Sequence, residues 1–215
     1  MSLKRTVIAV MIPAVLLLLP LSARTRAQVG QGIMDVNGMT EAQLTALPGM
    51  TPALVKGVME KRPFENVKAL DDYLKSQGMT AEQTAAIYET AFIHLNLNTA
   101  TGPEILLVPK IARRMTREFE EYRPWRTWEQ FDREIGKYVG AEETNRLKKY
   151  VFIPIDLNTA SDETIMTIPG MTPRMLREFK EYRPWKTKEQ FDREIGKYVG
   201  PAETARLWRF VVIGG

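Results

Sequence analysis

The sequence predicts an all-α fold, and three observations lead to this prediction. Apolar side chains recur at helical spacing, as in Met175, Leu176, Phe179 and Tyr182. No alternation of apolar and polar residues extends beyond a few positions, so no long strand is expected. Helix starts carry the capping-box pattern of a threonine followed three residues later by a glutamine. The pairs are Thr40 with Gln43, Thr127 with Gln130, and Thr187 with Gln190.

The first 27 residues differ from the rest of the chain. Lys4 and Arg5 precede an uncharged run over residues 7–20. As a helix this run would be roughly 21 Å long, short of a bilayer core of about 30 Å. Small residues at Thr25 and Ala27 suit a signal peptidase. We therefore expect a signal peptide over 1–27 and export to the periplasm or the cell exterior. The alternative is an uncleaved anchor, through which alone the chain would contact a membrane.

The leader also carries the chain's excess charge. The sequence has 30 basic and 26 acidic residues, and its pI is about 9.2. The leader holds four basic residues and no acid, so the remaining chain has 26 of each sign. The basic pI therefore does not indicate nucleic-acid binding.

The composition excludes most enzyme designs. There is no cysteine and a single histidine, His94, which rules out disulfides, a thiolate nucleophile and a two-histidine metal site. His94 reads as a linker residue. Four acids beside Arg133 and Arg193 could act in catalysis, but they suit a solvated helix face better. They are Asp132, Glu134, Asp192 and Glu194. We expect no enzyme, no cofactor, no metal and no small-molecule substrate.

An internal repeat is the strongest signal in the chain. At a spacing of 60, residues 95–153 match residues 155–213 at 35 of 59 positions, too many for chance similarity. A diverged copy precedes them, because Leu-Pro-Gly-Met-Thr-Pro at 47–52 mirrors Ile-Pro-Gly-Met-Thr-Pro at 168–173. The chain thus divides into copy one (28–94), copy two (95–154) and copy three (155–215). No Gly/Ser-rich linker separates them, so we expect end-to-end packing.

Each copy should contain four short helices, most clearly in copy three. Thr172 is a good N-cap, and Pro173 suits the first helical position. Pro184 ends that helix. The next helix starts after Thr187 and reaches a turn between Gly196 and Gly200. A last helix carries Leu207, Phe210 and Val211.

The motifs in this order resemble a known family. The Asp-Leu-Asn-Thr-Ala-Ser run at 156–161, Ile-Pro-Gly-Met at 168–171, Tyr182-Arg183, Phe191 and Val199-Gly200 are similar to a tandem helix-hairpin-helix domain. The type is that of the exported competence DNA receptor (ComEA-like). The resemblance covers almost all of residues 28–215. It implies three double helix-hairpin-helix units and sequence-independent DNA binding without catalysis. Related modules serve as structural subunits.

In that family a Gly-hydrophobic-Gly hairpin and the following helix N-terminus direct backbone N–H groups at a phosphate. Each corresponding turn departs from this pattern in at least one residue. Copy three has Gly170-Met171-Thr172, and the second turns keep Gly140 and Gly200. Copy two has Lys110-Ile111-Ala112 with no glycine. These residues are the candidate contacts, with Arg113, Arg114, Arg117, Arg174 and Arg177.

Copy two holds the densest basic cluster, formed by Lys110, Arg113, Arg114 and Arg117. Cations are disfavoured at a helix N-terminus, and contact with phosphate would explain their presence. The alternative is a solvated face paired with Glu118, Glu120 and Glu121. The net charges are −3, +2 and +1 for copies one, two and three, so a polyanion should prefer copies two and three.

Two sets of aromatic residues are candidates for contact. Trp125 and Trp185 could stack on bases beside Arg123 and Arg183, but Phe64 fills the same position in copy one, which favours a core residue. Trp128 and Trp208 align with lysines, so we expect them to be exposed. They and Tyr88, which aligns with Trp208, would serve copy-to-copy packing or a partner.

Two functions follow from these observations. The first is a non-enzymatic, exported protein that binds double- or single-stranded DNA through its phosphates. The second is a structural or scaffold protein of the cell envelope that holds another protein.

Overall fold

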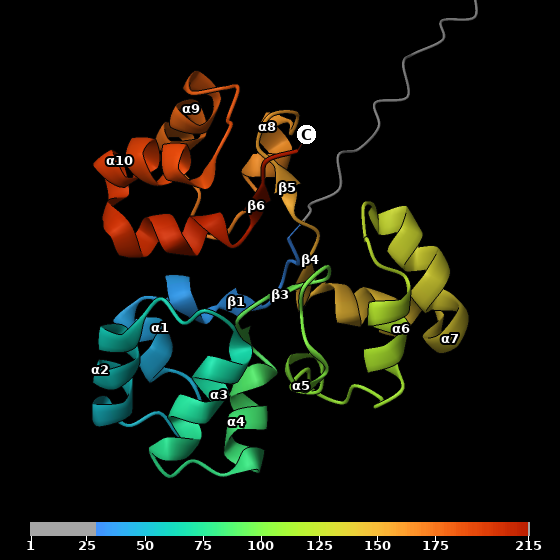
Figure 1. The fold of residues 1–215 in the computed structure, drawn as a ribbon. Coiled ribbons are helices and arrows are strands. Elements are labelled where there is room, and N and C mark those ends of the chain that lie inside the picture. The colour runs from blue at the N-terminus through green and yellow to red at the C-terminus, as the bar shows by residue number, and fades with distance from the viewer. Residues whose placement is uncertain (1–28, 215) are drawn as a thin grey trace, which may run out of the picture.

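The computed structural model describes residues 29–214, and within them the chain is mostly helical, as predicted. Ten α-helices and six two-residue strands follow one another in these residues (Figure 1). Copy one contains β1 (Met34–Asp35), the 3-10 helix η1 (Val36–Gly38), α1 (Glu41–Thr45), α2 (Pro52–Lys61), α3 (Val67–Ser76), α4 (Ala81–Tyr88) and β2 (Ala91–Phe92). Copy two contains β3 (Leu95–Asn96), α5 (Gly102–Ile105), α6 (Met115–Glu121), α7 (Trp128–Lys148) and β4 (Val151–Phe152). Copy three contains β5 (Ile155–Asp156), α8 (Asp162–Ile165), α9 (Pro173–Glu181), α10 (Lys188–Trp208) and β6 (Val211–Val212). The predicted signal peptide lies outside the described residues.

Side-chain caps start most of the helices. Thr40 and Gln43 form the complete capping box that the sequence predicts. Thr127 and Thr187 cap α7 and α10. There the glutamine side chain accepts from the residue before the cap, so the box is shifted by one residue. Thr172 caps α9 with Pro173 in its first turn, as predicted. The last two predicted helices of copies two and three form one run with a break at Gly140 and at Gly200, where φ is near +76°.

Each copy is closed by a pair of short parallel strands that the sequence did not predict. β1 pairs with β2, β3 with β4, and β5 with β6. The two strands of a pair open and close the same copy. Val29 adds an antiparallel bridge to Phe152, and the Gly30 amide donates to the Val151 carbonyl oxygen at 3.0 Å. The outer edge of β4 is therefore covered by the chain's own segment 29–30.

The tryptophan position is a core position in every copy. Trp125, Trp185 and Phe64 are buried, so the core prediction is confirmed and base stacking by these tryptophans is excluded. Asn98 bonds both the backbone N–H and C=O of Trp125, and Asn158 does the same for Trp185. The indoles donate to the carbonyl oxygens of Phe119 and Phe179. The asparagine of the Leu-Asn-Thr-Ala run therefore has a structural role, because it fixes the backbone of the buried tryptophan.

Arg123 and Arg183 are structural as well. Arg183 Nε donates to the Leu157 carbonyl oxygen and Nη2 to that of Ala160, and Arg123 bonds Leu97 and Ala100 in the same way. The peptide bond that follows each of these arginines, to Pro124 and to Pro184, is cis. Arg123 therefore ties the start of copy two to the end of α6, and Arg183 ties the start of copy three to the end of α9.

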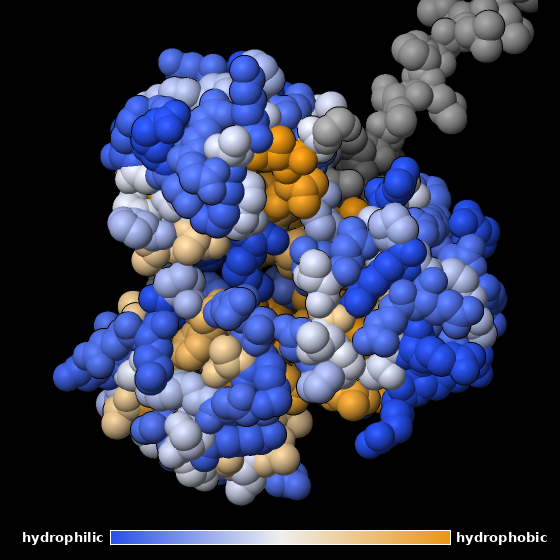
Figure 2. All heavy atoms as spheres, in the orientation of Figure 1, coloured by the Kyte–Doolittle hydropathy of each residue, from blue (hydrophilic) through white to orange (hydrophobic). Residues whose placement is uncertain are grey.

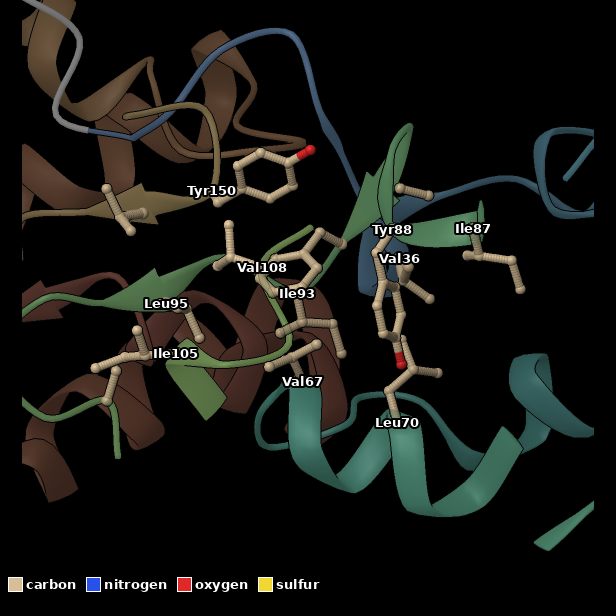
Figure 3. Close-up of a cluster of buried hydrophobic side chains, with 14 of the residues drawn as sticks. Val36, Val67, Leu70, Ile87, Tyr88, Ile93, Leu95, Ile105, Val108 and Tyr150 are labelled. Carbon is tan, nitrogen blue, oxygen red and sulfur yellow. The ribbon is translucent and has the colours of Figure 1, made fainter. Parts of the chain in front are cut away.

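Copies one and two share one hydrophobic core. Figure 3 shows Tyr88, Ile93 and Val67 of copy one grouped with Val108 and Tyr150 of copy two. The Phe92 ring also meets the Tyr150 ring edge-on at 5.3 Å. Copy three has a second cluster, to which Phe152 of copy two and Val29 contribute.

The three copies close on themselves, which corrects the expected end-to-end packing. Figure 1 shows three lobes around a common centre, α1–α4, α5–α7 and α8–α10. Arg209 of copy three donates from Nη2 to the His94 carbonyl oxygen at 3.1 Å, and its Nη1 lies 3.9 Å from Asp35 Oδ2. His94 Nδ1 lies 3.4 Å from the same carboxylate oxygen. His94 is thus not a linker side chain but a buried part of the contact between copies one and three.

Two of the three aromatic residues that were expected to be exposed are buried. Trp128 is 5% exposed, because it packs on Phe131 and shares a small hollow with the segment Val29–Gln31. Tyr88 is buried and packs edge-on against Phe92. Trp208 is half-buried against Phe191. The ring and hydroxyl contacts of Tyr88, with Phe92 and Asp71, lie within copy one, and of the three residues only Trp208 presents much surface to a partner.

Candidate functional site

The candidate contacts lie on turns between helices, and one residue of each turn is in the left-handed region. Gly49, Gly140, Gly170 and Gly200 have φ between 74° and 77°. Gly78, with φ 91°, holds the same position in a turn that the sequence reading missed. Its Gly78-Met79-Thr80 run repeats the Gly-Met-Thr of the first turn, which was the available signal. Apart from the half-buried Gly200, these glycines are exposed.

Copy two places Lys110 where the other copies have glycine. Lys110 has φ 58°, the one described non-glycine residue at positive φ. A side chain in this region costs about 1–2 kcal/mol. The Lys110 ammonium lies 2.9 Å from Glu89 Oε1 of copy one, an exposed pair that returns little of this energy.

Lys110→Gly is expected to raise the free energy of unfolding by about 1 kcal/mol, because glycine adopts this conformation without strain. Urea unfolding measures the change. Lys110→Ala is the matched control, since it removes the ion pair and keeps the strain. Equal stability of the two variants would contradict the strain argument.

The start of α6 offers unpaired backbone donors. No side chain caps α6, and within residues 29–214 the amides of Ala112, Arg113 and Arg114 have no hydrogen-bond acceptor. In copy three, by contrast, Thr172 caps the helix and Pro173 has no N–H. The loss of the Thr-Pro pair therefore leaves copy two with three successive free amides at an exposed turn.

Four exposed cations surround these amides. Arg114 Nε lies 3.4 Å from Oε1 of the buried Glu118, and Arg117 reaches both Glu118 and Glu121 at under 4 Å. Of the three acids that the alternative interpretation names, Glu118 and Glu121 thus pair with these arginines. Arg113 has no ion pair in the described part of the chain, although it is exposed beside the turn.

The two turns of a copy are adjacent. Arg114, at the first turn of copy two, lies with its guanidinium 4.2 Å from the ring centre of Tyr138, at the second turn. Arg174 stands 5.5 Å from the ring of Tyr198 in copy three. Tyr122 and Tyr138 share a hydrogen bond of 3.0 Å, and this bond together with burial raises the pKa of Tyr138 to about 12. Tyr138 therefore stays neutral, and its contacts with Tyr122 and Arg114 hold the second turn against the first.

Arg146 and Arg206 are structural residues that the sequence reading missed. Arg146 Nη1 donates to the Pro109 carbonyl oxygen behind the first turn of copy two, while its other nitrogens pair with Glu143. Arg206 pairs with Glu203 and lies under Gly170. Arg146 and Arg206 correspond at the repeat spacing of 60, and this conserved arginine in both copies was the signal that could have identified them.

The first turn of copy three faces copy one. Gly170 and Met171 line a hollow of about 360 Å³ whose other wall is the segment 30–39 of copy one. Arg174 and Arg177 are exposed beside it. Both basic turns are therefore exposed, and the three free amides distinguish the turn of copy two.

The acids weighed for catalysis are paired with cations. Hydrogen bonds from Lys137 and Arg133 lower the pKa of Glu134, and Lys197 and Arg193 do the same for Glu194. Asp192 pairs with Lys188, and Asp132 with Lys148. Residues 29–214 contain no group of three or more histidine, aspartate or glutamate side chains arranged to hold a metal ion.

Comparison of the chain with protein-family models, with curated proteins and with solved structures finds no match. No helix within residues 29–214 is both long and apolar enough to cross a bilayer. The turns and their exposed donors are therefore the features that bear on function.

Proposed function

We propose that the chain is a tandem helix-hairpin-helix protein of three double units that binds nucleic acid through its phosphates, chiefly at copy two. One observation carries the proposal: three successive free amides, at residues 112–114, lie within a group of four exposed cations. Backbone amides and arginines together are the donors that phosphate oxygens prefer. Copy three contributes Arg174 and Arg177 through a turn of the same form.

The proposed binding is independent of base sequence. Base sequence is read by side chains that reach base edges, whereas aromatic rings that stack on bases tolerate any sequence. Trp125, Trp185 and Trp128 are buried in the core. The contacts that remain are backbone amides and cations, which recognise the sugar-phosphate backbone alone.

Arg113→Ala combined with Arg117→Ala is expected to weaken binding to duplex and single-stranded DNA. Because neutralised phosphates release counterions, log K should fall with log salt by about 0.9 per phosphate on duplex DNA, and the double variant should lose one to two such contacts. Fluorescence anisotropy over a salt series measures the slope. Export would place this activity in the periplasm or outside the cell.

Arg126→Ala combined with Arg133→Ala is the matched control. It removes the same charge from exposed positions of copy two that lie outside the first turn. Equal slopes for the two double variants would show that general charge, and not the turn, determines binding. No binding by the unaltered chain at low salt would end the proposal.

A scaffold function is the second candidate. It is favoured by the balanced charge of residues 28–215, by the pairing of Arg114 and Arg117 with acids, and by an open strand edge in copy three. An envelope protein would then be the partner.

A further inference from the structure

We propose that the outer edge of β6 binds an extended segment of another polypeptide, with an apolar residue followed by glycine. The proposal follows from the internal repeat, because the corresponding strand edge in copy two is occupied by another segment of the chain. β4 and β6 are counterparts at a spacing of 60, and each pairs on its inner side with the first strand of its own copy. The segment Val29–Gly30 lies antiparallel along the outer side of β4.

No segment of residues 29–214 covers the outer edge of β6 in this way. The Val151 carbonyl oxygen accepts from Gly30, whereas its counterpart, the Val211 carbonyl oxygen, has no hydrogen-bond partner within residues 29–214. The Ile213 amide is also unpaired there. The side chain of Phe152 is 1% exposed, and that of its counterpart Val212 is 41% exposed. The run Val-Val-Ile-Gly at 211–214 carries no charge or proline that would discourage strand addition.

A cavity lies in copy three at the position that corresponds to Gly30 in copy two. In copy two, Gly30 lies against the backbone of Lys148 and Lys149. Their counterparts Trp208 and Arg209, with Val211, line a cavity of about 430 Å³ where the three copies meet. Figure 2 shows the surface hollowed between the three lobes.

The covered edge also indicates which segment fits. A Cβ on Gly30 would stand 2.2 Å from the Lys148 carbonyl oxygen, so copy two accepts only glycine there. The Trp208 carbonyl oxygen takes that place in copy three and imposes the same requirement. Val29, just before the glycine, pairs with Phe152, whose counterpart in copy three is the apolar and exposed Val212. Strand addition supplies backbone bonds, and these two positions supply the selectivity.

A peptide with the sequence of residues 29–34, Val-Gly-Gln-Gly-Ile-Met, is the probe, because β4 in the intact chain already holds this segment. Titrated into the isotope-labelled chain and followed by NMR, it is expected to shift the amides of residues 211–214. The dissociation constant should be on the order of 1 mM, and alanine in place of the first glycine should weaken binding about tenfold.

Ile213→Pro removes the outward donor and keeps the inner pairing, so it should weaken peptide binding about tenfold. Ile213→Val keeps the donor and is the matched control. Val212→Lys places a charge on the edge at an exposed position and should also weaken binding, whether or not the proline variant folds. Shifts at residues 151–153 in place of 211–214, an unchanged affinity in both edge variants, or no shifts at millimolar peptide would each overturn the proposal.

Discussion

Arg209→Met is expected to lower the free energy of unfolding by about 3 kcal/mol, because it leaves the buried carboxylate of Asp35 without its arginine. The same change breaks the bond from Arg209 to the His94 carbonyl oxygen, which joins copy three to copy one. Urea unfolding followed by circular dichroism measures the loss.

Arg126→Met is the control for this prediction, since it removes an exposed arginine and should change stability by less than about 0.5 kcal/mol. Adding Asp35→Asn to Arg209→Met should recover part of the loss, because the unpaired charge is then gone. A cost below about 1 kcal/mol for Arg209→Met alone would show that the contact holds the copies together weakly.

The same contact has a pH dependence with a defined sign. Burial alone would raise the pKa of Asp35, but the hydrogen bond from His94, the charge of Arg209 and the Asn37 amide outweigh it and hold this pKa below its ordinary value of 3.8. A depressed carboxyl pKa stabilises the folded chain above the ordinary value, and the contribution is lost as the pH falls through the lowered pKa. The stability advantage of the unaltered chain over Asp35→Asn should therefore shrink below about pH 4.

Features built from neighbouring residues could be predicted from the sequence. The caps at Thr40, Thr172 and Thr187 are bonds between a side chain and the backbone three residues later, so the local pattern contains all of their information. The core position of Trp125 and Trp185 followed from Phe64 in the same place. Sequence reading also identified Arg113 and Arg117 as exposed cations beside a turn.

Features made by distant residues could not be predicted. A two-residue strand is too short to show alternation, so the strand pairs left no sign. The contact from Arg209 to His94 spans 115 positions, and no pattern in one sequence marks it. The exposure of Trp128 was predicted wrongly because Lys188 stands at its position in copy three. The segment 29–31 lies beside Trp128 in copy two, whereas no corresponding segment of the described chain lies beside Lys188.

The same segment explains a difference between copies two and three, which match in sequence at 35 of 59 positions. Val29–Gln31 lies along the outer edge of β4 and beside Trp128, whereas no segment of residues 29–214 covers the corresponding edge of copy three. Copy two is therefore complete within the chain and presents its basic turn, whereas copy three keeps an open strand edge. The proposed phosphate surface and the proposed peptide edge thus lie on different copies and can be tested separately.

Trp185→Ala is expected to cost about 4 kcal/mol and to unfold copy three ahead of the rest of the chain. Trp185 is fully buried in the cluster of copy three and donates its indole N–H to the Phe179 carbonyl oxygen at 2.7 Å. Truncation of a buried tryptophan leaves a cavity and an unpaired carbonyl, which together account for a loss of this size. Because copies one and two share a separate cluster, they should keep their structure at urea concentrations where copy three has unfolded.

Trp185→Phe and Trp125→Ala are the matched variants. The phenylalanine variant should cost only about 1–2 kcal/mol, since Phe64 fills this position in copy one. Trp125→Ala removes the same side chain from the cluster that copies one and two share, so those two copies should unfold together. Hydrogen exchange measured for each copy separates these outcomes. A single transition for the whole chain in Trp185→Ala would mean that the contacts of Arg209 and Phe152 couple copy three to its neighbours more strongly than its own core holds it.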